Sequence, residues 1–124
     1  SDRRRALPVV TLGSEAVSLT AWSNDVDYES AFARQVEALG QPGDVVLGIT
    51  TSGSSANVVT ALETARGLQL TTIALTGRDG GAAGRMADVH INVPSDVTPR
   101  VQEVHMTLLH VICDLVETEL SADR

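Results

Sequence analysis

Hydroxyl side chains are concentrated at one point of the chain, where four fall within six residues: Thr50, Thr51, Ser52 and Ser55. A phosphate group needs several donors that converge on it, and a helix N-terminus favours its negative charge. Gly53 permits a tight turn among them, and Ser54 or Ser55 can cap a following helix. Most such clusters are only turns with a cap, but an apolar run before this one and an amphipathic segment after it favour a phosphate-binding loop.

Three histidines could transfer protons near neutral pH: His90, His105 and His110. Their positions alone indicate ordinary structural residues, because His105 and His110 fall in a helical pattern and His90 in a strand-like segment. The single cysteine, Cys113, cannot form an internal disulfide, and we expect it to be a buried small hydrophobic residue. A reducing, cytoplasmic location fits this cysteine usage.

Strand-like and helical patterns alternate along the chain and must position these groups. The patterns predict strands over residues 7–12, 44–50, 70–76 and 89–94. They predict helices over residues 27–39, 55–66, 83–86 and 100–120, a loop or short helical turn over 14–21, and a helix C-cap at Gly67.

This alternation predicts an α/β fold with a three-layer parallel sheet and flanking helices, flavodoxin-like or Rossmann-like, in a single domain over residues 1–124. Residues 44–50 are nearly all apolar, so we expect them to form a central strand. In such sheets ligands bind beyond the C-terminal ends of the strands. The hydroxyl cluster follows residues 44–50 and therefore falls at such an end.

Composition narrows the class of protein. A chain of 124 residues has room for one domain, and 43% hydrophobic with 20% charged residues is typical of globular proteins. The formal net charge of −7 repels nucleic-acid backbones and anionic membranes, so we expect neither as a partner. No apolar run is long enough to span a membrane, and the run after the basic start is too short for a signal peptide.

The stretch from Gly48 to Asn57 is similar to the Ser-Thr-Ser-Gly-Asn-Ser loop of sugar isomerase (SIS) domains, which binds a sugar phosphate. Residues 23–25, 32–44, 75–81 and 100–105 resemble phosphoheptose isomerases in order and spacing, so the resemblance covers nearly the whole chain. It implies the aldose–ketose isomerisation of sedoheptulose 7-phosphate to D-glycero-D-manno-heptose 7-phosphate. That reaction supplies heptose for bacterial surface polysaccharides such as lipopolysaccharide.

The resemblance also implies roles for particular residues. It implies that the four hydroxyl residues bind phosphate, that Asn24, Asp25 and Gln102 contact the substrate, and that His110 is a general acid/base. In some members a zinc ion has ligands that match Gln102 and His110. An isomerisation through an enediol needs such a proton-transfer group, and zinc would polarise the carbonyl. The two residues lie eight positions apart, or about 12 Å along an ideal helix, so they could share an ion only with other ligands.

The chain departs from the family pattern at its start. Family members carry N-terminal helices, a first strand and a Gly-rich turn that supply an Asn, a catalytic Glu and a zinc-binding His, and nothing in residues 1–124 matches them. That strand would lie between residues 7–12 and 44–50, so we expect unpaired edges there. We predict that this chain is a fragment or is completed by another copy, and that it is inactive alone. In smaller departures, Pro99 stands where some members have Asp, and Thr50 replaces a serine.

Two other functions fit the same resemblance. A related group of SIS proteins binds the bacterial replication initiator DnaA as an adaptor, and other SIS domains sense phosphosugars in regulators. The presence of His110 favours the isomerase over the adaptor, because the isomerase chemistry needs this histidine and the adaptor function does not. SIS proteins of this type usually form tetramers, so the resemblance implies a homo-oligomer. The broad apolar stripe over residues 100–120 fits packing between subunits or within one chain.

Overall fold

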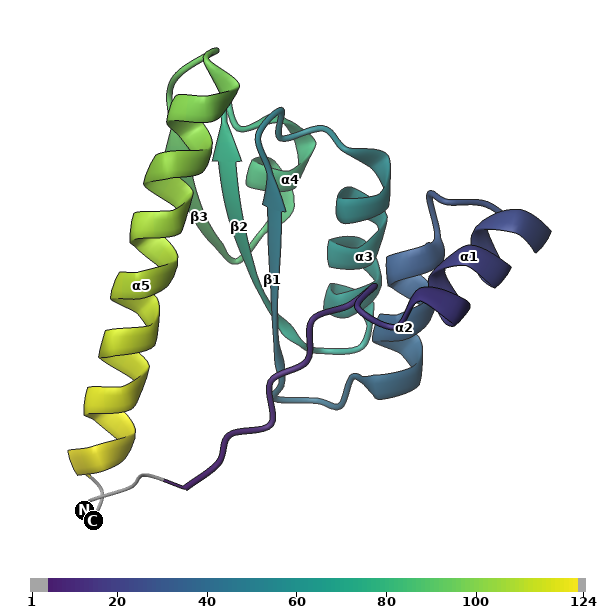
Figure 1. Cartoon of the computed structure of the whole chain (residues 1–124), viewed down its shortest axis with the longest axis horizontal. Helices are drawn as coiled ribbons and strands as arrows, with labels where there is room; N and C mark the ends of the chain where they lie inside the picture. The colour runs from purple at the N-terminus through teal and green to yellow at the C-terminus, as the bar shows by residue number, and fades with distance from the viewer. Residues whose placement is uncertain (1–4, 123–124) are drawn as a thin grey trace.

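Three parallel strands form the centre of the structure, a computed structural model that describes residues 5–122 (Figure 1). The strands are β1 (Val45–Thr50), β2 (Thr71–Gly77) and β3 (Val89–Val93), in the order β1-β2-β3. Thr50 lies opposite Thr76, and Gly77 lies opposite Val93. Because all three strands run the same way, the loops that leave their carboxyl ends meet at one edge of the sheet.

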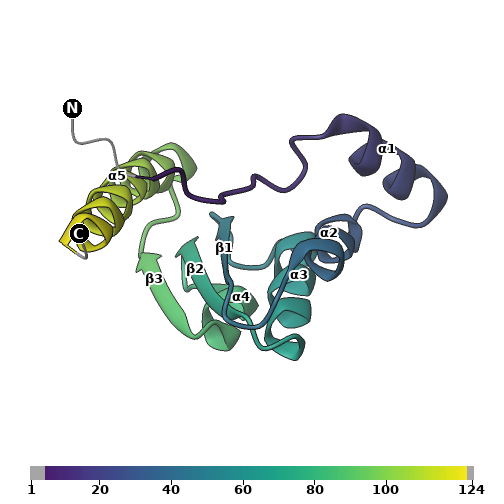
Figure 2. The ribbon, with the colours of Figure 1, turned by 90° about the horizontal axis from the view of Figure 1, so that it is seen from below.

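Helices lie on both faces of this sheet, as Figure 2 shows. On one face are α3 (Ala56–Gly67) and α4 (Gly81–Met86), with α2 (Ala31–Leu39) packed against α3. On the other face, α5 (Thr98–Ala122) contacts β2 and β3. The first helix, α1 (Ala16–Asp25), contacts α2 at the periphery. The predicted α/β architecture, a parallel sheet with flanking helices, is confirmed.

The core is built from small and aliphatic side chains between the sheet and α3, α4 and α2. Leu62 and Ala74 are fully buried and pack with Ala83, and a second cluster joins Val36 to Leu70. On the α5 face, Leu75 of β2 and Val101 of α5 are also buried. Burial on both faces explains why β2 is apolar apart from its threonines; the two buried ones, Thr72 and Thr76, have hydrogen-bonded hydroxyls.

The strand predicted over residues 7–12 is wrong. This segment is irregular, and Val9 and Val10 project into solvent with 84% and 64% of their surface exposed. A β-branched run forms a strand only where a neighbouring strand receives its hydrogen bonds. Within the described residues this segment has no such neighbour, and its Val9 N–H donates to the Leu7 carbonyl 3.0 Å away.

The central strand of the sheet is β2, and the prediction that residues 44–50 form it is wrong. In the described residues β1 is an edge strand, and the expected unpaired edge lies along it. Val45 and Ile49 of β1 are 58% and 43% exposed. They alternate with Val46 and Gly48, and Gly48 lies directly under Val58 and Leu62 of α3. The apolar sequence of β1 thus reflects two apolar faces, of which one is uncovered.

Helix boundaries also differ from the prediction. Residues 14–21, expected as a loop or short turn, begin the ten-residue helix α1, capped by the unusual N-cap Glu15. Helix α2 starts four residues later than expected, because Asp27 accepts hydrogen bonds from the backbone and hydroxyl of Ser30 and forms a turn. Gly67 is the last residue of α3 and not its cap; Gln69, with φ of 65°, takes the left-handed conformation beyond it.

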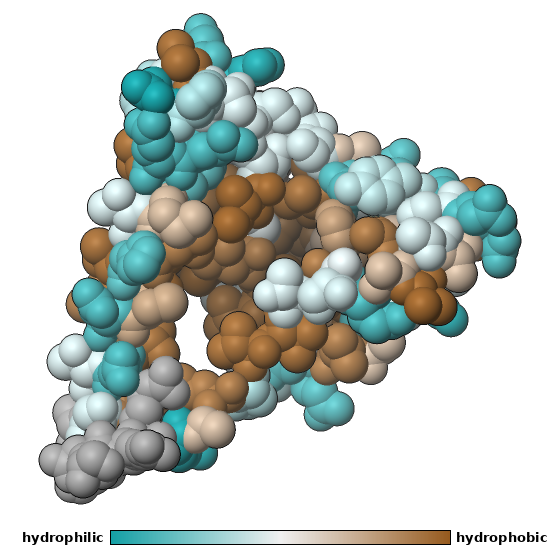
Figure 3. All heavy atoms as spheres, in the orientation of Figure 1, coloured by the Kyte–Doolittle hydropathy of each residue, from teal (hydrophilic) through white to brown (hydrophobic). Residues whose placement is uncertain are grey.

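Helix α5 packs on the sheet only through its first turns. Val101 and His105 are buried, whereas Val111, Leu115 and Val116 are 47%, 64% and 42% exposed. Cys113, expected to be buried, is also exposed. Figure 3 shows hydrophobic residues gathered in the hollow between α5 and the rest of the molecule. None of the helices in the described residues is long and apolar enough to cross a membrane.

Candidate functional site

The hydroxyl cluster lies where the sequence predicted it, between the carboxyl end of β1 and the start of α3. Thr50, the last residue of β1, is buried, with 4% of its surface exposed. Its hydroxyl lies 2.8 Å from the Ser55 hydroxyl and 3.3 Å from the Ser52 hydroxyl. Three of the four predicted phosphate-binding hydroxyls are therefore joined in one cluster, and Thr51 lies between Thr50 and Ser52 on the same loop.

Ser55 is the N-cap residue of α3, but its side chain makes no capping hydrogen bond. Its hydroxyl turns to Thr50 instead. Ser52 is held in turn by Ser54, whose backbone N–H and hydroxyl both donate to the Ser52 oxygen at 3.2 Å. A 12-residue helix thus points its positive end at a loop of hydroxyls that do not cap it, which is the arrangement an anion needs.

Gly53 locks this loop against the neighbouring loop that follows β2. It has a φ of 71°, and a Cβ atom there would lie 2.2 Å from the carbonyl oxygen of Gly80. The Gly53 carbonyl accepts a 2.9 Å hydrogen bond from the N–H of Ala83 in α4. Glycine is required at Gly53 by both conformation and space, and the two loops form one rigid edge.

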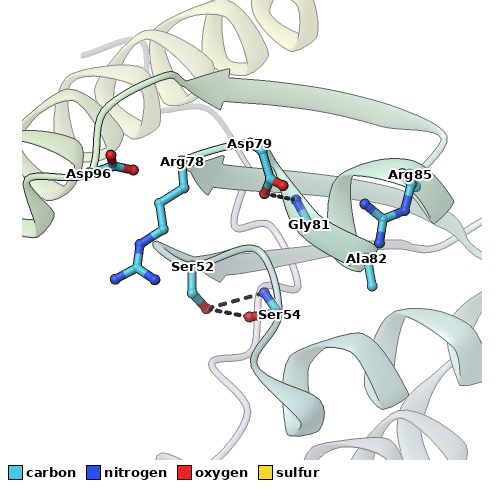
Figure 4. Close-up of a pocket in the computed structure, with 8 residues that line it drawn as sticks. All are labelled: Ser52, Ser54, Arg78, Asp79, Gly81, Ala82, Arg85 and Asp96. Atoms are coloured by element: carbon cyan, nitrogen blue, oxygen red, sulfur yellow. Dashed lines mark hydrogen bonds between the residues drawn. The ribbon is translucent and has the colours of Figure 1, made fainter.

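A shallow depression of about 590 Å³ opens beside the hydroxyl loop. Four segments line it: the loop after β1, the loop after β2, α4 and the loop before α5 (Figure 4). The lining residues are Ser52, Ser54, Arg78, Asp79, Gly81, Ala82, Arg85 and Asp96. The charged members were not among the predicted site residues. The available signal was the Gly-rich turn after residues 70–76, which had to reach the same edge of the sheet.

A network of side-chain hydrogen bonds between β2 and β3 holds the loop after β2 in place. The Thr76 hydroxyl donates to Asn92 Oδ1 at 2.9 Å, so His90 Nε2–H donates to Thr76 at 2.6 Å. Asn92 Nδ2 then donates to the carbonyl of Arg78 at 3.0 Å. His90 thus has the structural role that its position indicated.

His105 is likewise structural. It is 3% exposed, and its Nε2–H donates to the carbonyl of Thr76 at 2.7 Å, which ties α5 to the sheet.

The remaining predicted site residues lie elsewhere. Asn24 and Asp25 end α1, are exposed and bond to each other at 3.0 Å. Gln102 and His110 are exposed on α5. Figures 1 and 2 both place α1 and α5 at opposite ends of the molecule. A single chain therefore brings the hydroxyls together but does not bring Asp25 to His110.

The described residues do not form a complete metal site. Within residues 5–122, no three His, Cys, Asp or Glu side chains are placed to hold a metal ion. Zinc normally takes four ligands, three of them from the protein even in catalytic sites. Gln102 and His110 could supply two at most, so any zinc site on this chain needs further ligands.

Known proteins resemble this chain over most of its length. The family model described as SIS domain matches residues 3–77, more than half of the chain. The chain belongs to the SIS domain family. The phosphoheptose isomerase of Geotalea daltonii is 52% identical over 121 residues, which is 98% of this chain and 63% of that protein. The phosphoheptose isomerase of Sulfurimonas denitrificans is 47% identical over 120 residues, 97% of this chain and 62% of that protein.

Solved structures agree with this family assignment. A phosphoheptose isomerase from Francisella tularensis matches with a TM-score of 0.89 and 40% identity, over 93% of this chain and 62% of that one. The phosphoheptose isomerase of Neisseria gonorrhoeae matches with a TM-score of 0.85 and 46% identity, over 86% of this chain and 61% of that one. This SIS domain chain therefore spans less than two thirds of the length of the phosphoheptose isomerases that it matches.

Proposed function

We propose that the loop from Thr50 to Ser55 binds the phosphate of a sugar phosphate, and that the protein acts as an aldose–ketose isomerase on sedoheptulose 7-phosphate. The observation that carries this proposal is the hydroxyl cluster at the start of α3. Thr50, Ser52 and Ser55 converge there, and Ser55 leaves the helix uncapped. The 52% identity to a phosphoheptose isomerase supports the choice of reaction.

The reaction moves a proton between C1 and C2 of the sugar through an enediol. His110 is our candidate for this transfer, because an imidazole can give or take a proton near neutral pH. It is exposed on α5, with no side-chain hydrogen bond within the described residues, so both ring nitrogens are open to a ligand. Asn24, Asp25 and Gln102 are our candidates for contacts to the sugar hydroxyls, since their amide and carboxylate groups are exposed.

We propose that a complete site requires more than one described chain. Asp25 ends α1 and His110 belongs to α5, two helices at opposite ends of the molecule, and α5 leaves Val111 and Leu115 exposed. A homo-oligomer, with a tetramer as the predicted form, would cover this apolar surface. On this proposal the chain alone binds the sugar phosphate but does not turn it over.

We also propose a zinc site to which the described residues supply only some of the ligands. Gln102 and His110 would be two of its ligands, and further ligands would come from outside the described residues. When bound, the ion would polarise the carbonyl of the sugar. We also propose a cytoplasmic protein that binds neither nucleic acid nor membranes, in keeping with its single cysteine and net charge of −7.

A second candidate is an adaptor or regulatory SIS domain that binds another protein. The exposed apolar residues of α5, Val104, Val111 and Leu115, favour it, because such a stripe fits a protein partner as well as another subunit. This function requires no turnover and no role for His110.

Isothermal titration with sedoheptulose 7-phosphate tests the proposed function. We expect saturable binding to the unmodified chain and no measurable binding to a Ser52→Ala, Ser55→Ala double variant. Ser14→Ala, an exposed serine outside the loop, is the matched control and should bind normally. A folded chain that does not bind the sugar phosphate would overturn the isomerase proposal and favour the adaptor.

A further inference from the structure

Two arginines stand apart from the others in the described part of the chain. Arg34 pairs with Glu37, and Arg100 pairs with Glu103. Arg66 donates to the carbonyl of Met86. Arg5 has an interaction partner as well. The remaining two, Arg78 and Arg85, make no side-chain hydrogen bond or ion pair within residues 5–122, and both line the depression beside the hydroxyl loop.

Arg78 and Arg85 place two positive charges around one depression of a protein whose net charge is negative. The chain has a net charge of −7, yet two guanidinium groups that have no partner among the described residues occur in one depression with Ser52. Two carboxylates also line it, and Asp79 already accepts a 3.0 Å hydrogen bond from the N–H of Gly81. In Figure 4 the Arg78 side chain extends from the end of β2 toward the loop that carries Ser52.

The backbone at Arg78 does not favour an arginine. Its φ is 52°, in the left-handed region that glycine enters freely and other residues enter at a cost. Two hydrogen bonds hold it there: Asn92 Nδ2 donates to its carbonyl, and its N–H donates to the carbonyl of Ser95, each at 3.0 Å. The fold therefore gains nothing from arginine at this position, and strain of this kind points to a role for the side chain.

We propose that Arg78 is a phosphate-binding residue that gives the hydroxyl loop its selectivity for a phosphomonoester. This inference rests on the proposed function of the loop and deepens it. The hydroxyls of Ser52 and its neighbours are neutral and cannot balance a dianion. A guanidinium does so through charge-assisted, paired hydrogen bonds. The mixed lining, with Asp96 as a hydroxyl acceptor, suits a phosphorylated polyol more than a polyanion.

The test measures binding of inorganic phosphate and of sedoheptulose 7-phosphate by isothermal titration to the whole chain and its variants. Arg78→Gly is the principal variant, because it removes the guanidinium and relieves the backbone. We expect an unchanged or higher melting temperature and binding of both ligands weakened by about tenfold or more. Arg78→Lys keeps the charge without the planar fork and should fall between the two. Arg34→Gln removes the same charge on α2, away from the depression, and should bind within about twofold of the parent.

The outcomes separate this inference from the proposed function. If the unmodified chain binds neither ligand, the function of the loop fails and the role of Arg78 fails with it. If Ser52→Ala, Ser55→Ala abolishes binding but Arg78→Gly binds as well as the parent, the loop function stands and the Arg78 proposal is overturned. Loss of binding in Arg78→Gly with full thermal stability, and a weaker salt dependence of the remaining affinity, supports it.

Discussion

Gly53 and Gly80 meet backbone to backbone, so closely that a Cβ atom on Gly53 would lie 2.2 Å from the carbonyl oxygen of Gly80. The loop that follows β1 and the loop that follows β2 are thereby held together at the carboxyl edge of the sheet. The hydroxyls of one loop and Arg78 of the other are brought to a single depression by this contact. The geometry of the candidate site thus depends on two residues that have no side chain.

Gly53→Ala should destabilise the protein and distort the site. Alanine would have to adopt a φ of 71°, which costs at least about 1 kcal/mol, and its methyl group would displace the Gly80 carbonyl. We expect a lower melting temperature and loss of phosphate binding. Gly43→Ala is the control: its φ is 92° but no atom lies within 4 Å of the added Cβ, so it bears the conformational cost alone. Equal stability and binding in the two variants would show that the Gly53–Gly80 contact has no effect.

Thr50→Val should weaken phosphate binding by about tenfold, or about 1.4 kcal/mol. The Thr50 hydroxyl is buried and orients the Ser55 and Ser52 hydroxyls, and valine has the same shape without the oxygen. Thr50→Ser retains the oxygen and should bind like the parent chain. Titration of all three proteins with inorganic phosphate measures the difference, and parent-like affinity of Thr50→Val would refute the role of this hydroxyl.

The two histidines of α5 should differ strongly in how much their substitution changes stability. His105→Ala should reduce the free energy of unfolding by about 2 kcal/mol or more, because it leaves a cavity and a buried Thr76 carbonyl without its donor. His110→Ala removes an exposed side chain and should change it by less than about 0.5 kcal/mol. Urea denaturation of both variants gives the comparison, and a His110→Ala change as large as that of His105→Ala would contradict it.

Asp88→Asn should remove one source of acid sensitivity. The pKa of Asp88 is lowered by the hydrogen bond from the Thr72 backbone N–H and by that from the Thr72 hydroxyl. A lowered folded-state pKa contributes stability that is present above the ordinary carboxyl pKa and is lost as the pH falls through the folded value. Asp88→Asn should therefore be less stable than the parent near neutral pH, and the gap should close in acid.

Urea denaturation at several pH values follows that gap. Thr72→Val keeps the backbone donor but loses the hydroxyl donor, so it should show part of the effect. A stability gap between Asp88→Asn and the parent that stays constant from neutral pH to acid would rule out the linkage.

Val45→Lys with Ile49→Lys should reduce self-association of the isolated chain. Both residues are exposed on the uncovered face of β1, whose outer edge is unpaired in the described residues. Lysines on an edge strand oppose pairing with other chains. Val26→Lys with Val97→Lys adds the same charge at two residues that are each 54% exposed and lie outside β1. Light scattering should show smaller species for the β1 variant alone, and equal sizes for both would remove β1 from the interface.

Local sequence was sufficient for the class of fold and for the place of the hydroxyl loop. Strand and helix periods alternate, and the hydroxyl residues from Thr50 to Ser55 follow an apolar strand, so their position at the sheet edge follows from parallel topology alone. The left-handed residues at Gly53 and Gly80 also fit a sequence rule, since glycine enters that region without cost.

Other features depended on contacts with segments distant in the sequence, which no local sequence pattern indicates. Residues 7–12 have the composition of a strand, but within residues 5–122 no strand lies beside them to pair with. In the same residues β1 is as apolar as a central strand but lies at an edge. Arg78 has a sequence neighbourhood like that of any turn. The pairing of β1 with β2 and the packing of Gly80 against Gly53 bring it beside Ser52, because contacts between segments far apart in the chain are made by tertiary structure and not by periodicity.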